Sequence, residues 1–178
     1  KMFFNHYKNH INNICDILRN VGVNINTVPV LDVRRKKSHS IIGSRSFSES
    51  STVVSNLGRL CVGFYNKNKI GTVIKHMPGL GLSKCDSHYK TPIIKASKKE
   101  LTKRDFKPFK ACKSLFAMTA HAVYPKYDSY YTATHSKIII NEIIRNDMNF
   151  KGLLISDDIS MKSLKYSLEE NALKALHA

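Results

Sequence analysis

The sequence contains four short apolar runs, and each of them ends in titratable residues. In chain order these residues are Asp32, the pair Lys75-His76, His121, and the pair Asp157-Asp158. A further acid and imidazole, Asp86 and His88, lie in a segment that Gly79 and Gly81 introduce. Imidazole has an unperturbed pKa of about 6.5, so it can give and take protons at neutral pH. The residue types therefore suit proton transfer at the ends of strands.

Each group also has a structural interpretation. An Asp after a strand is often a helix cap, so Asp32 and Asp158 fit a capping or supporting role as well as a site. Taken alone, the segment Asp86–His88 is typical of a loop turn, and the pair Lys75-His76 of a solvated strand end. His121 also fits a structural role. Their shared position after strands is what favours a site.

Hydrophobic periodicity predicts that strands and helices alternate along the chain. Strands are expected at Ile25–Val33, Ile70–Ile74, Leu115–Ala122 and Gly152–Ile155. Helices are expected at 3–21, 52–66, 98–112, 136–146 and from about 161 onward. Polar loops are expected at 34–51, from 79 to about 92, and up to about 134. Pro108 indicates a break or a fresh start within the third helix.

This alternation indicates an α/β fold of about four β/α units with parallel strands. A Rossmann sheet and part of a (β/α)₈ TIM-type barrel share the pattern. The Rossmann fold requires G-x-G-x-x-G after a strand, and the only near match, Gly79-Leu80-Gly81, lacks the third glycine. We therefore expect a partial barrel.

The 178 residues suffice for a single domain, 1–178, with its own core. A full barrel takes about 250 residues, so the chain is expected to be an internal portion of a barrel domain. None of the four cysteines forms a C-x-x-C pair, which favours a reducing, cytoplasmic location and no metal site. No apolar run reaches the roughly 18 residues of a membrane span, so no membrane partner is expected.

The formal net charge of +16 arises from 29 Lys and Arg against 13 Asp and Glu. Such an excess indicates an anionic partner, namely nucleic acid, an acidic membrane surface or an acidic small substrate. It also fits a composition that is rich in Lys, Asn, Ile and Ser throughout. Only residues 34–37 form a basic run, and no nucleic-acid-binding motif accompanies it. We expect no nucleic-acid partner and keep a basic nucleic-acid-binding module as the weakest alternative.

Five segments together resemble glycoside hydrolase family 3, and most closely its NagZ-type β-N-acetylglucosaminidases of peptidoglycan recycling. They are GVNINTVPVLDV (22–33), IGSRSF (42–47), KHMPGLGLSKCDSH (75–88), MTAH (118–121) and FKGLLISDDISMK (150–162). They occur in the family's order and span most of the chain. The family pattern has His at the position of Leu80. The barrel of the family extends beyond both ends of this sequence. We expect the rest of a longer chain to supply the missing barrel strands, and the alternatives are one piece of a split barrel or the product of a decaying gene.

The resemblance also implies roles for individual residues. Asp157 matches the catalytic nucleophile, His88 the general acid/base, and Asp86 the partner of that histidine. The residues that match those holding the sugar hydroxyls are Arg45, Lys75 and His76. The implied reaction is a retaining double displacement that releases N-acetylglucosamine from GlcNAc-anhydroMurNAc peptides, with no cofactor. The alternative is a catalytically inactive remnant or fragment that keeps the motifs without a complete pocket.

Overall fold

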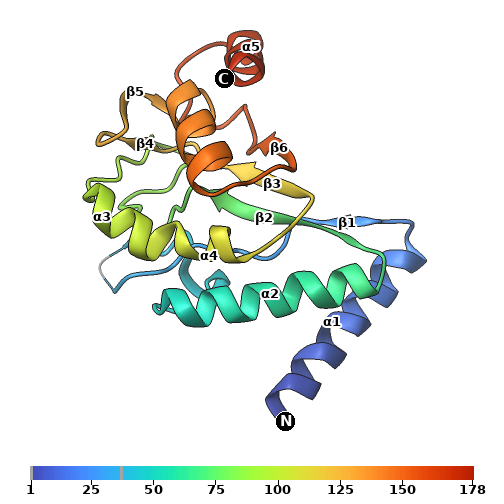
Figure 1. Cartoon of the computed structure of the whole chain (residues 1–178). Coiled ribbons are helices and arrows are strands. Elements are labelled where there is room, and N and C mark those ends of the chain that lie inside the picture. The colour runs from blue at the N-terminus through green and yellow to red at the C-terminus, as the bar shows by residue number, and fades with distance from the viewer. Residues whose placement is uncertain (1, 37) are drawn as a thin grey trace.

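Four parallel strands in the order β1-β2-β3-β6 form the central sheet of the computed structural model, which describes residues 2–36 and 38–178 (Figure 1). The strands are β1 (Ile25–Asn26), β2 (Gly71–Met77), β3 (Phe116–Thr119) and β6 (Leu153–Ser156). Parallel pairing holds across all three junctions of this sheet. The sequence-based expectation of an α/β fold with four parallel strands is confirmed. Lys37, the last residue of the basic run, lies outside the described residues.

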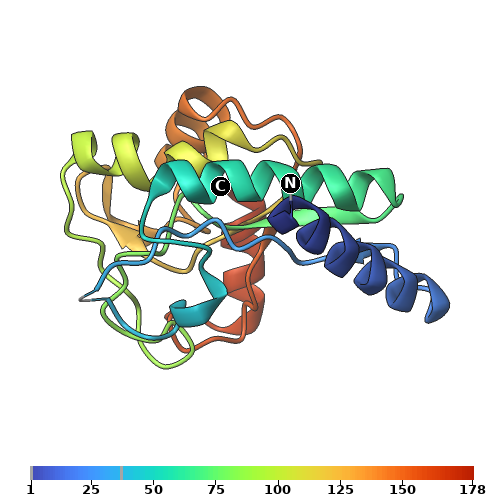
Figure 2. The same ribbon diagram turned by 90° about the horizontal axis from the view of Figure 1, so that it is seen from below.

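Helices alternate with the strands along the chain, and several of them cover one face of the sheet. They are α1 (Met2–Asn20), α2 (Ser51–Lys67), α3 (Lys98–Glu100), η2 (Leu101–Asp105), α4 (Lys107–Ala111), η3 (Ile139–Asp147) and α5 (Leu168–His177). In Figure 2, α2, α4 and η3 lie on the same side of the strands. Pro108 lies in the first turn of α4, where its missing N–H is tolerated, so the fresh start is confirmed.

The main core lies between these helices and the sheet. Strand residues such as Ile74 and Ala117 pack there against helix residues such as Leu101, Phe106 and Ile139, all of them fully buried. A smaller cluster, which includes Ile11 and Cys61, joins α1 to α2. Cys15, Cys61 and Cys112 are buried and Cys85 is half-buried, and all four thiols are free. Packing of this kind fixes the strands, and the strands in turn fix the loops at their carboxyl ends.

The first strand is much shorter than its sequence indicates. Residues 25–33 were expected to form one strand, but β1 ends at Asn26, and Val30 pairs with Lys75 only through an isolated bridge. The physical reason is Pro29, which has no N–H to donate to a sheet ladder. The expectation of a continuous strand was therefore wrong, although Leu31 N still donates to Lys75 O.

Two further segments differ from their expected structure. The region expected to be loop up to Thr134 contains an antiparallel pair, β4 (Val123–Tyr124) and β5 (Asp128–Thr132). In β5 the three central side chains are all exposed, so the sequence lacks the alternation that predicts a strand. The last helix begins at Leu168 rather than near Met161, because Ser167 and Glu170 form a capping box there.

Both outer strands of the sheet expose apolar side chains. Ile25 on β1 is 42% exposed, and Leu153 on β6 is 61% exposed. Exposed apolar edges are the feature expected of a sheet that continues into further strands. Within the described residues, no helix combines the length and apolar character that crossing a bilayer requires.

Candidate active site

The carboxyl ends of the four parallel strands meet at one edge of the sheet, and the titratable residues noted in the sequence gather there. His76 lies within the end of β2, His121 follows β3, and Asp157 directly follows β6. Asp32 lies in the segment after β1, where Leu31 is hydrogen-bonded to β2. In a parallel α/β fold this edge is where ligands bind.

Asp32, His76 and Asp157 form a line across the edge. His76 Nδ1 lies 2.7 Å from Asp32 Oδ2, and His76 Nε2 lies 3.8 Å from Asp157 Oδ2. Asp32 is completely buried, His76 is almost so, and the Asp157 side chain is 18% exposed. The imidazole therefore connects a buried carboxylate to a carboxylate that solvent can reach.

Lys75 and Arg45 lie beside this line. Both residues border one cavity of about 360 Å³ between α1, α2 and the segment that follows β1. Burial lowers the pKa of Lys75, and the negative charge of Asp157 opposes that shift. The Arg45 guanidinium is exposed and donates from Nη2 to its own loop at Ile41 O (2.6 Å). Lys75 thus belongs to the Asp157 cluster, while Arg45 reaches it only as a neighbouring charge.

Asp86 and His88 form a local pair on the loop after β2. Asp86 Oδ1 lies 2.7 Å from His88 Nδ1 and accepts a 2.8 Å hydrogen bond from His88 N. The His88 backbone N–H is the main reason that the pKa of Asp86 lies below its usual value, and the His88 ring contributes as well. Because Nδ1 is occupied by Asp86, the free position of the His88 ring is Nε2.

Two hydrogen bonds join the His88 loop to the loop after Asp157. Lys162 N donates to His88 O (3.2 Å), and Thr91 Oγ1 donates to Ser163 O (2.6 Å). His88 is also close enough to contribute to the lowered pKa of Asp158, whose main cause is hydrogen bonding by Ser160. The structure therefore brings the two loops side by side at the same edge of the sheet.

His121 and Asp158 support the loop that carries Asp157. The buried His121 ring lies 2.9 Å from Asp158 O through Nε2 and 2.7 Å from Thr134 Oγ1 through Nδ1. Burial lowers the pKa of His121, which favours the neutral ring that can both donate and accept in these two contacts. The Asp158 carboxylate accepts from Ser160 N and Oγ within its own turn. His121 and Asp158 thus both make structural contacts. This agrees with the structural role that the sequence analysis allowed for His121 and with the supporting role that it allowed for Asp158.

The sequence analysis did not assign Asp32 to the site, yet Asp32 contacts His76, which it did assign. Its carboxylate accepts from Leu80 N at 2.6 Å as well as contacting His76. The sequence did carry a signal for Asp32, because Asp32 ends an apolar run just as Lys75 and Asp157 do. Among the described residues, no three His, Cys, Asp or Glu side chains are grouped in a way that would hold a metal ion.

Gly81 is required where the β2 loop passes the Asp32 segment. A Cβ on Gly81 would overlap the Val33 carbonyl group and lie 2.9 Å from Val33 N, and all of these atoms are backbone. We expect Gly81→Ala to lower the free energy of unfolding by about 3 kcal/mol, as overpacking against rigid atoms does. Urea denaturation measures this loss.

Gly63→Ala is the matched control for Gly81→Ala. Gly63 lies within α2, and a Cβ there meets no atom within 4 Å. Removing a helical glycine is expected to raise stability by about 0.5–1 kcal/mol. Equal denaturation midpoints for the two variants would contradict the close approach at Gly81.

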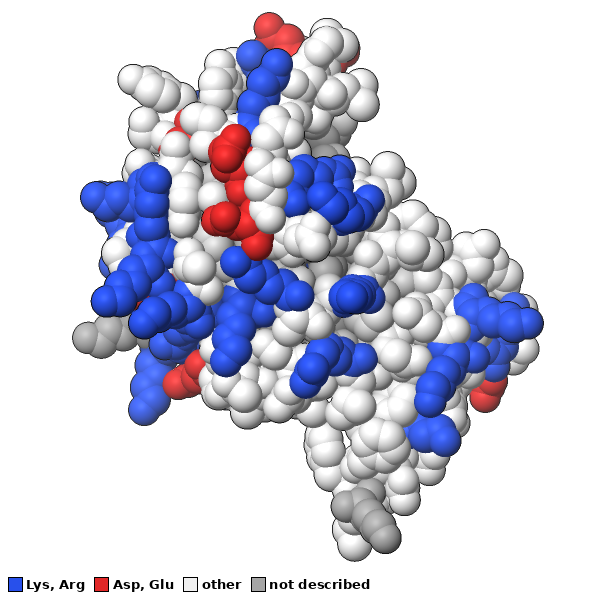
Figure 3. Space-filling view, viewed as in Figure 1, with Lys and Arg blue, Asp and Glu red and all other residues white. Residues whose placement is uncertain are grey.

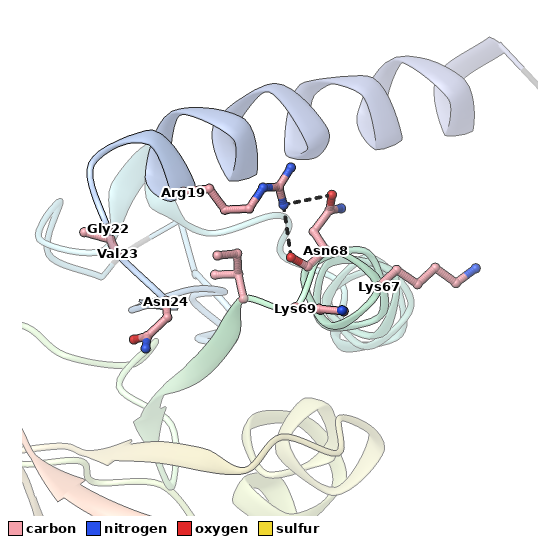
Figure 4. A pocket seen from close by; sticks show the side chains of 8 residues that line it. Arg19, Gly22, Val23, Asn24, Lys67, Asn68 and Lys69 are labelled. Carbon is pink, nitrogen blue, oxygen red and sulfur yellow. Dashed lines mark hydrogen bonds between the residues drawn. The ribbon is translucent and has the colours of Figure 1, made fainter.

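A second cavity lies away from these residues. It has a volume of about 490 Å³ and lies between the ends of α1 and α2, beside the residues that precede β1 and β2. Figure 4 shows Arg19 from α1 hydrogen-bonded to Asn68, with Lys67 and Lys69 nearby. The cavity is thus at the amino ends of the strands, where a parallel fold does not carry its chemistry, and no acidic residue lines it.

A parallel α/β sheet with acids and imidazoles at its carboxyl edge is the layout of a TIM-barrel enzyme. The chain belongs to glycosyl hydrolase family 3, because the model of the N-terminal domain of that family matches residues 8–178. The resemblance noted in the sequence is therefore confirmed.

Relatives of known structure agree with this assignment. A family 3 β-N-acetylglucosaminidase from Paenibacillus sp. superposes with a TM-score of 0.93 at 26% identity, covering 98% of this chain and 34% of that one. Native NagZ from Neisseria gonorrhoeae gives 0.83 at 31% identity, covering 92% and 48%. These likenesses confirm that the sheet corresponds to part of a TIM-type barrel.

Curated relatives agree as well. A beta-hexosaminidase from Actinobacillus pleuropneumoniae is 32% identical over 164 residues, which are 89% of this chain and 47% of that protein. Beta-hexosaminidase A from Pseudoalteromonas piscicida is 30% identical over 162 residues, 83% of this chain and 27% of that protein. The chain thus spans about half of the first relative and about a quarter of the second.

Proposed function

We propose that the protein containing this chain hydrolyses β-linked N-acetylglucosamine from glycosides with retention of configuration. The observation that carries the proposal is the pairing of two loops at one edge of the sheet. One loop carries Asp157 and the other carries the Asp86–His88 pair. The family and the names of its relatives support the sugar, since they are called beta-hexosaminidase and β-N-acetylglucosaminidase.

In the proposed first step, an oxygen of the Asp157 carboxylate attacks the anomeric carbon. The bond from that carbon to the leaving oxygen breaks, and His88 Nε2 gives its proton to the leaving oxygen. In the second step, Nε2 takes a proton from water, and the water oxygen displaces Asp157 from the anomeric carbon. Two inversions restore the configuration. Asp86 holds Nδ1 throughout, as the aspartate of a catalytic triad does.

Lys75, His76 and Arg45 complete the proposal as ligands of the sugar hydroxyls. Lys75 and His76 are supported by their place beside Asp157, with Nε2 of His76 at 3.8 Å from its carboxylate. Arg45 is supported by the cavity that it shares with Lys75. Its guanidinium would have to leave Ile41 O and turn toward the sugar.

We further propose GlcNAc-anhydroMurNAc peptides as the substrate and the cytoplasm as the compartment. Such peptides carry carboxylates, and Figure 3 shows a surface on which Lys and Arg side chains far outnumber Asp and Glu, notably over the side of α3. The four free thiols support a reducing compartment. The remaining strands of the same barrel domain would come from flanking parts of a longer chain. Neither nucleic acid nor membrane is a partner in this proposal.

The test uses the protein as its gene encodes it, with any residues that flank this chain. We expect release of 4-nitrophenol from its β-N-acetylglucosaminide, and little release from the matching β-glucoside. Proton NMR of the first product should show the β-anomer, because the mechanism retains configuration. Folded protein without turnover would favour an inactive remnant, and an α-anomer product would overturn the double displacement.

The natural substrate is tested by competition. GlcNAc-anhydroMurNAc peptide and a neutral chitin disaccharide are offered to the same protein, and kcat/KM is compared for the two. A preference for the peptide that weakens as salt rises is expected if the basic surface aids capture. Equal values at low salt would contradict the proposed substrate and leave the glycosidase proposal standing.

A further inference from the structure

Asp32 lies behind the site and touches no group that reacts in the proposed mechanism. Its side chain is 0% exposed, and its two oxygens face three donors. These are Leu80 N at 2.6 Å, His76 Nδ1 at 2.7 Å and His76 N at 3.3 Å. We propose that Asp32 is a positioning residue that fixes the hydrogen of the His76 ring on Nδ1 and so sets what Nε2 offers to the sugar. This inference rests on the proposed function.

The hydrogen-bond geometry determines which ring nitrogen carries the hydrogen. An ionised carboxylate can only accept hydrogen bonds, so His76 Nδ1 has to be the donor to Asp32. In the neutral ring, Nε2 is then an acceptor. It lies 3.8 Å from Asp157 Oδ2, longer than a hydrogen bond, as expected when two acceptors face each other. A sugar hydroxyl placed there would donate to Nε2.

The opposite tautomer would change the site. With its hydrogen on Nε2, the His76 ring would donate toward Asp157 and engage the oxygen that has to attack the anomeric carbon. It would also have no lone pair for a sugar hydroxyl. Asp32 thus keeps the nucleophile free of His76 and keeps an acceptor beside it, although Asp32 itself reaches neither Asp157 nor solvent.

Asp32 also supports the turn that leads toward His88. The same carboxylate accepts from Leu80 N, and Tyr124 Oη donates to the adjacent Gly79 O at 2.8 Å. A role limited to supporting this turn would act on stability and on the loop as a whole. The experiment must therefore separate an effect that passes through His76 from an effect on the fold.

The first variant is Asp32→Asn in the protein as its gene encodes it. The amide keeps the volume but has one acceptor fewer and a donor of its own, so the His76 hydrogen is expected to move to Nε2. Nitrogen-15 NMR of the histidine rings should show Nδ1–H for His76 in the unsubstituted protein and Nε2–H in the variant. We expect kcat to fall about 10³-fold, less than the roughly 10⁴-fold loss when a triad aspartate is replaced, because His76 binds the sugar and moves no proton in the proposed steps.

Asp128→Asn is the matched control for a buried, multiply bonded carboxylate. Asp128 is 8% exposed and accepts from Ser136 Oγ and from the backbone N–H groups of Tyr130 and Tyr131. The Asp128→Asn variant should lose about as much stability as Asp32→Asn does. Its kcat and its His76 tautomer should match those of the unsubstituted protein. A similar fall in kcat for this control would mean that loss of stability explains the Asp32 result, and would overturn the inference.

A double-mutant cycle gives the decisive readout. In a His76→Ala background, Asp32→Asn is expected to change kcat less than about threefold, because residues that act through one another are not additive. The full loss again in that background would overturn the inference. If the unsubstituted protein does not hydrolyse the substrate, the proposed function fails. The inference about Asp32 is then decided by the His76 tautomer alone. An Nε2–H pattern for His76 in the unsubstituted protein would overturn it even if Asp32→Asn does not fold.

Discussion

Asp157→Asn is expected to abolish hydrolysis of β-N-acetylglucosaminides while leaving the protein folded. The amide cannot attack the anomeric carbon, and loss of a residue that forms a covalent intermediate typically lowers kcat by about 10⁴-fold or more. Within the described residues the side chain has few contacts: Oδ1 accepts from the neighbouring Asp158 N, and Oδ2 lies 3.8 Å from His76 Nε2. Steady-state kinetics and thermal denaturation, measured on the same preparation, test both halves of this prediction.

Asp158→Asn is the control because it neighbours Asp157 and has the same chemistry. Its carboxylate is occupied by the Ser160 turn, which an asparagine can also form. We expect kcat to change less than about threefold, as for a surface substitution outside the reacting groups. A much larger loss for Asp158→Asn than for Asp157→Asn would show that the nucleophile was assigned to the wrong carboxylate.

Azide distinguishes a missing nucleophile from a distorted site. In Asp157→Ala, azide can enter the space of the lost carboxylate and attack the anomeric carbon directly. This single displacement inverts the configuration and yields the α-glycosyl azide. Formation of that product would identify Asp157 as the attacking group, whereas a β-glycosyl azide would mean that another residue still forms the intermediate.

The gathering of the titratable residues at one edge of the sheet could be predicted from the sequence because the relevant rule is local. Each apolar run ends in a titratable residue, and parallel strands place their carboxyl ends at one edge. This is why Lys75, His76 and Asp157 could be expected at one edge although 81 positions separate His76 from Asp157, while their individual roles came from the family resemblance. Their order along the chain is enough once the strands are known to be parallel.

The contacts that tune the site could not be predicted in the same way. Asp32 and His76 are 44 positions apart, and their 2.7 Å contact depends on a segment that is not a regular strand. A helix cap and a buried acceptor look alike in sequence, so both interpretations of Asp32 stayed open. Only the burial of its side chain and the direction of its donors distinguish them.

Leu80 shows how a departure from a family pattern can be resolved by burial. The pattern has His at this position, and a leucine there removes a polar side chain from the loop. In the structure the Leu80 side chain is buried in the main core, and the loop is held through the backbone N–H of Leu80 instead. The substitution thus exchanges a polar group for packing without removing the contact to Asp32.

His88→Ala is expected to lower kcat by about 10²–10⁴-fold on substrates whose leaving group needs a proton, which is the usual contribution of a general acid. The loss should be much smaller for a dinitrophenyl glycoside, because its leaving group departs without protonation. The His88 side chain is 55% exposed, so stability should be unchanged. His39→Ala is the control, since His39 is another exposed imidazole close enough to help lower the pKa of Asp86. An equal loss on both kinds of substrate would argue against proton donation by His88.

Asp86→Asn tests whether the acid beside His88 orients its ring. The pKa of Asp86 is lowered by the His88 N–H and, to a smaller extent, by the His88 ring, so the carboxylate is charged wherever the enzyme works. An ionised carboxylate can only accept hydrogen bonds, so it holds the His88 hydrogen on Nδ1 and leaves Nε2 free to face the leaving oxygen. An asparagine amide can donate as well as accept, so the ring is no longer held in one way, and kcat is expected to fall by up to about 10⁴-fold, as when a triad aspartate is replaced. Steady-state kinetics measures this loss, and an unchanged kcat would mean that Asp86 does not orient His88.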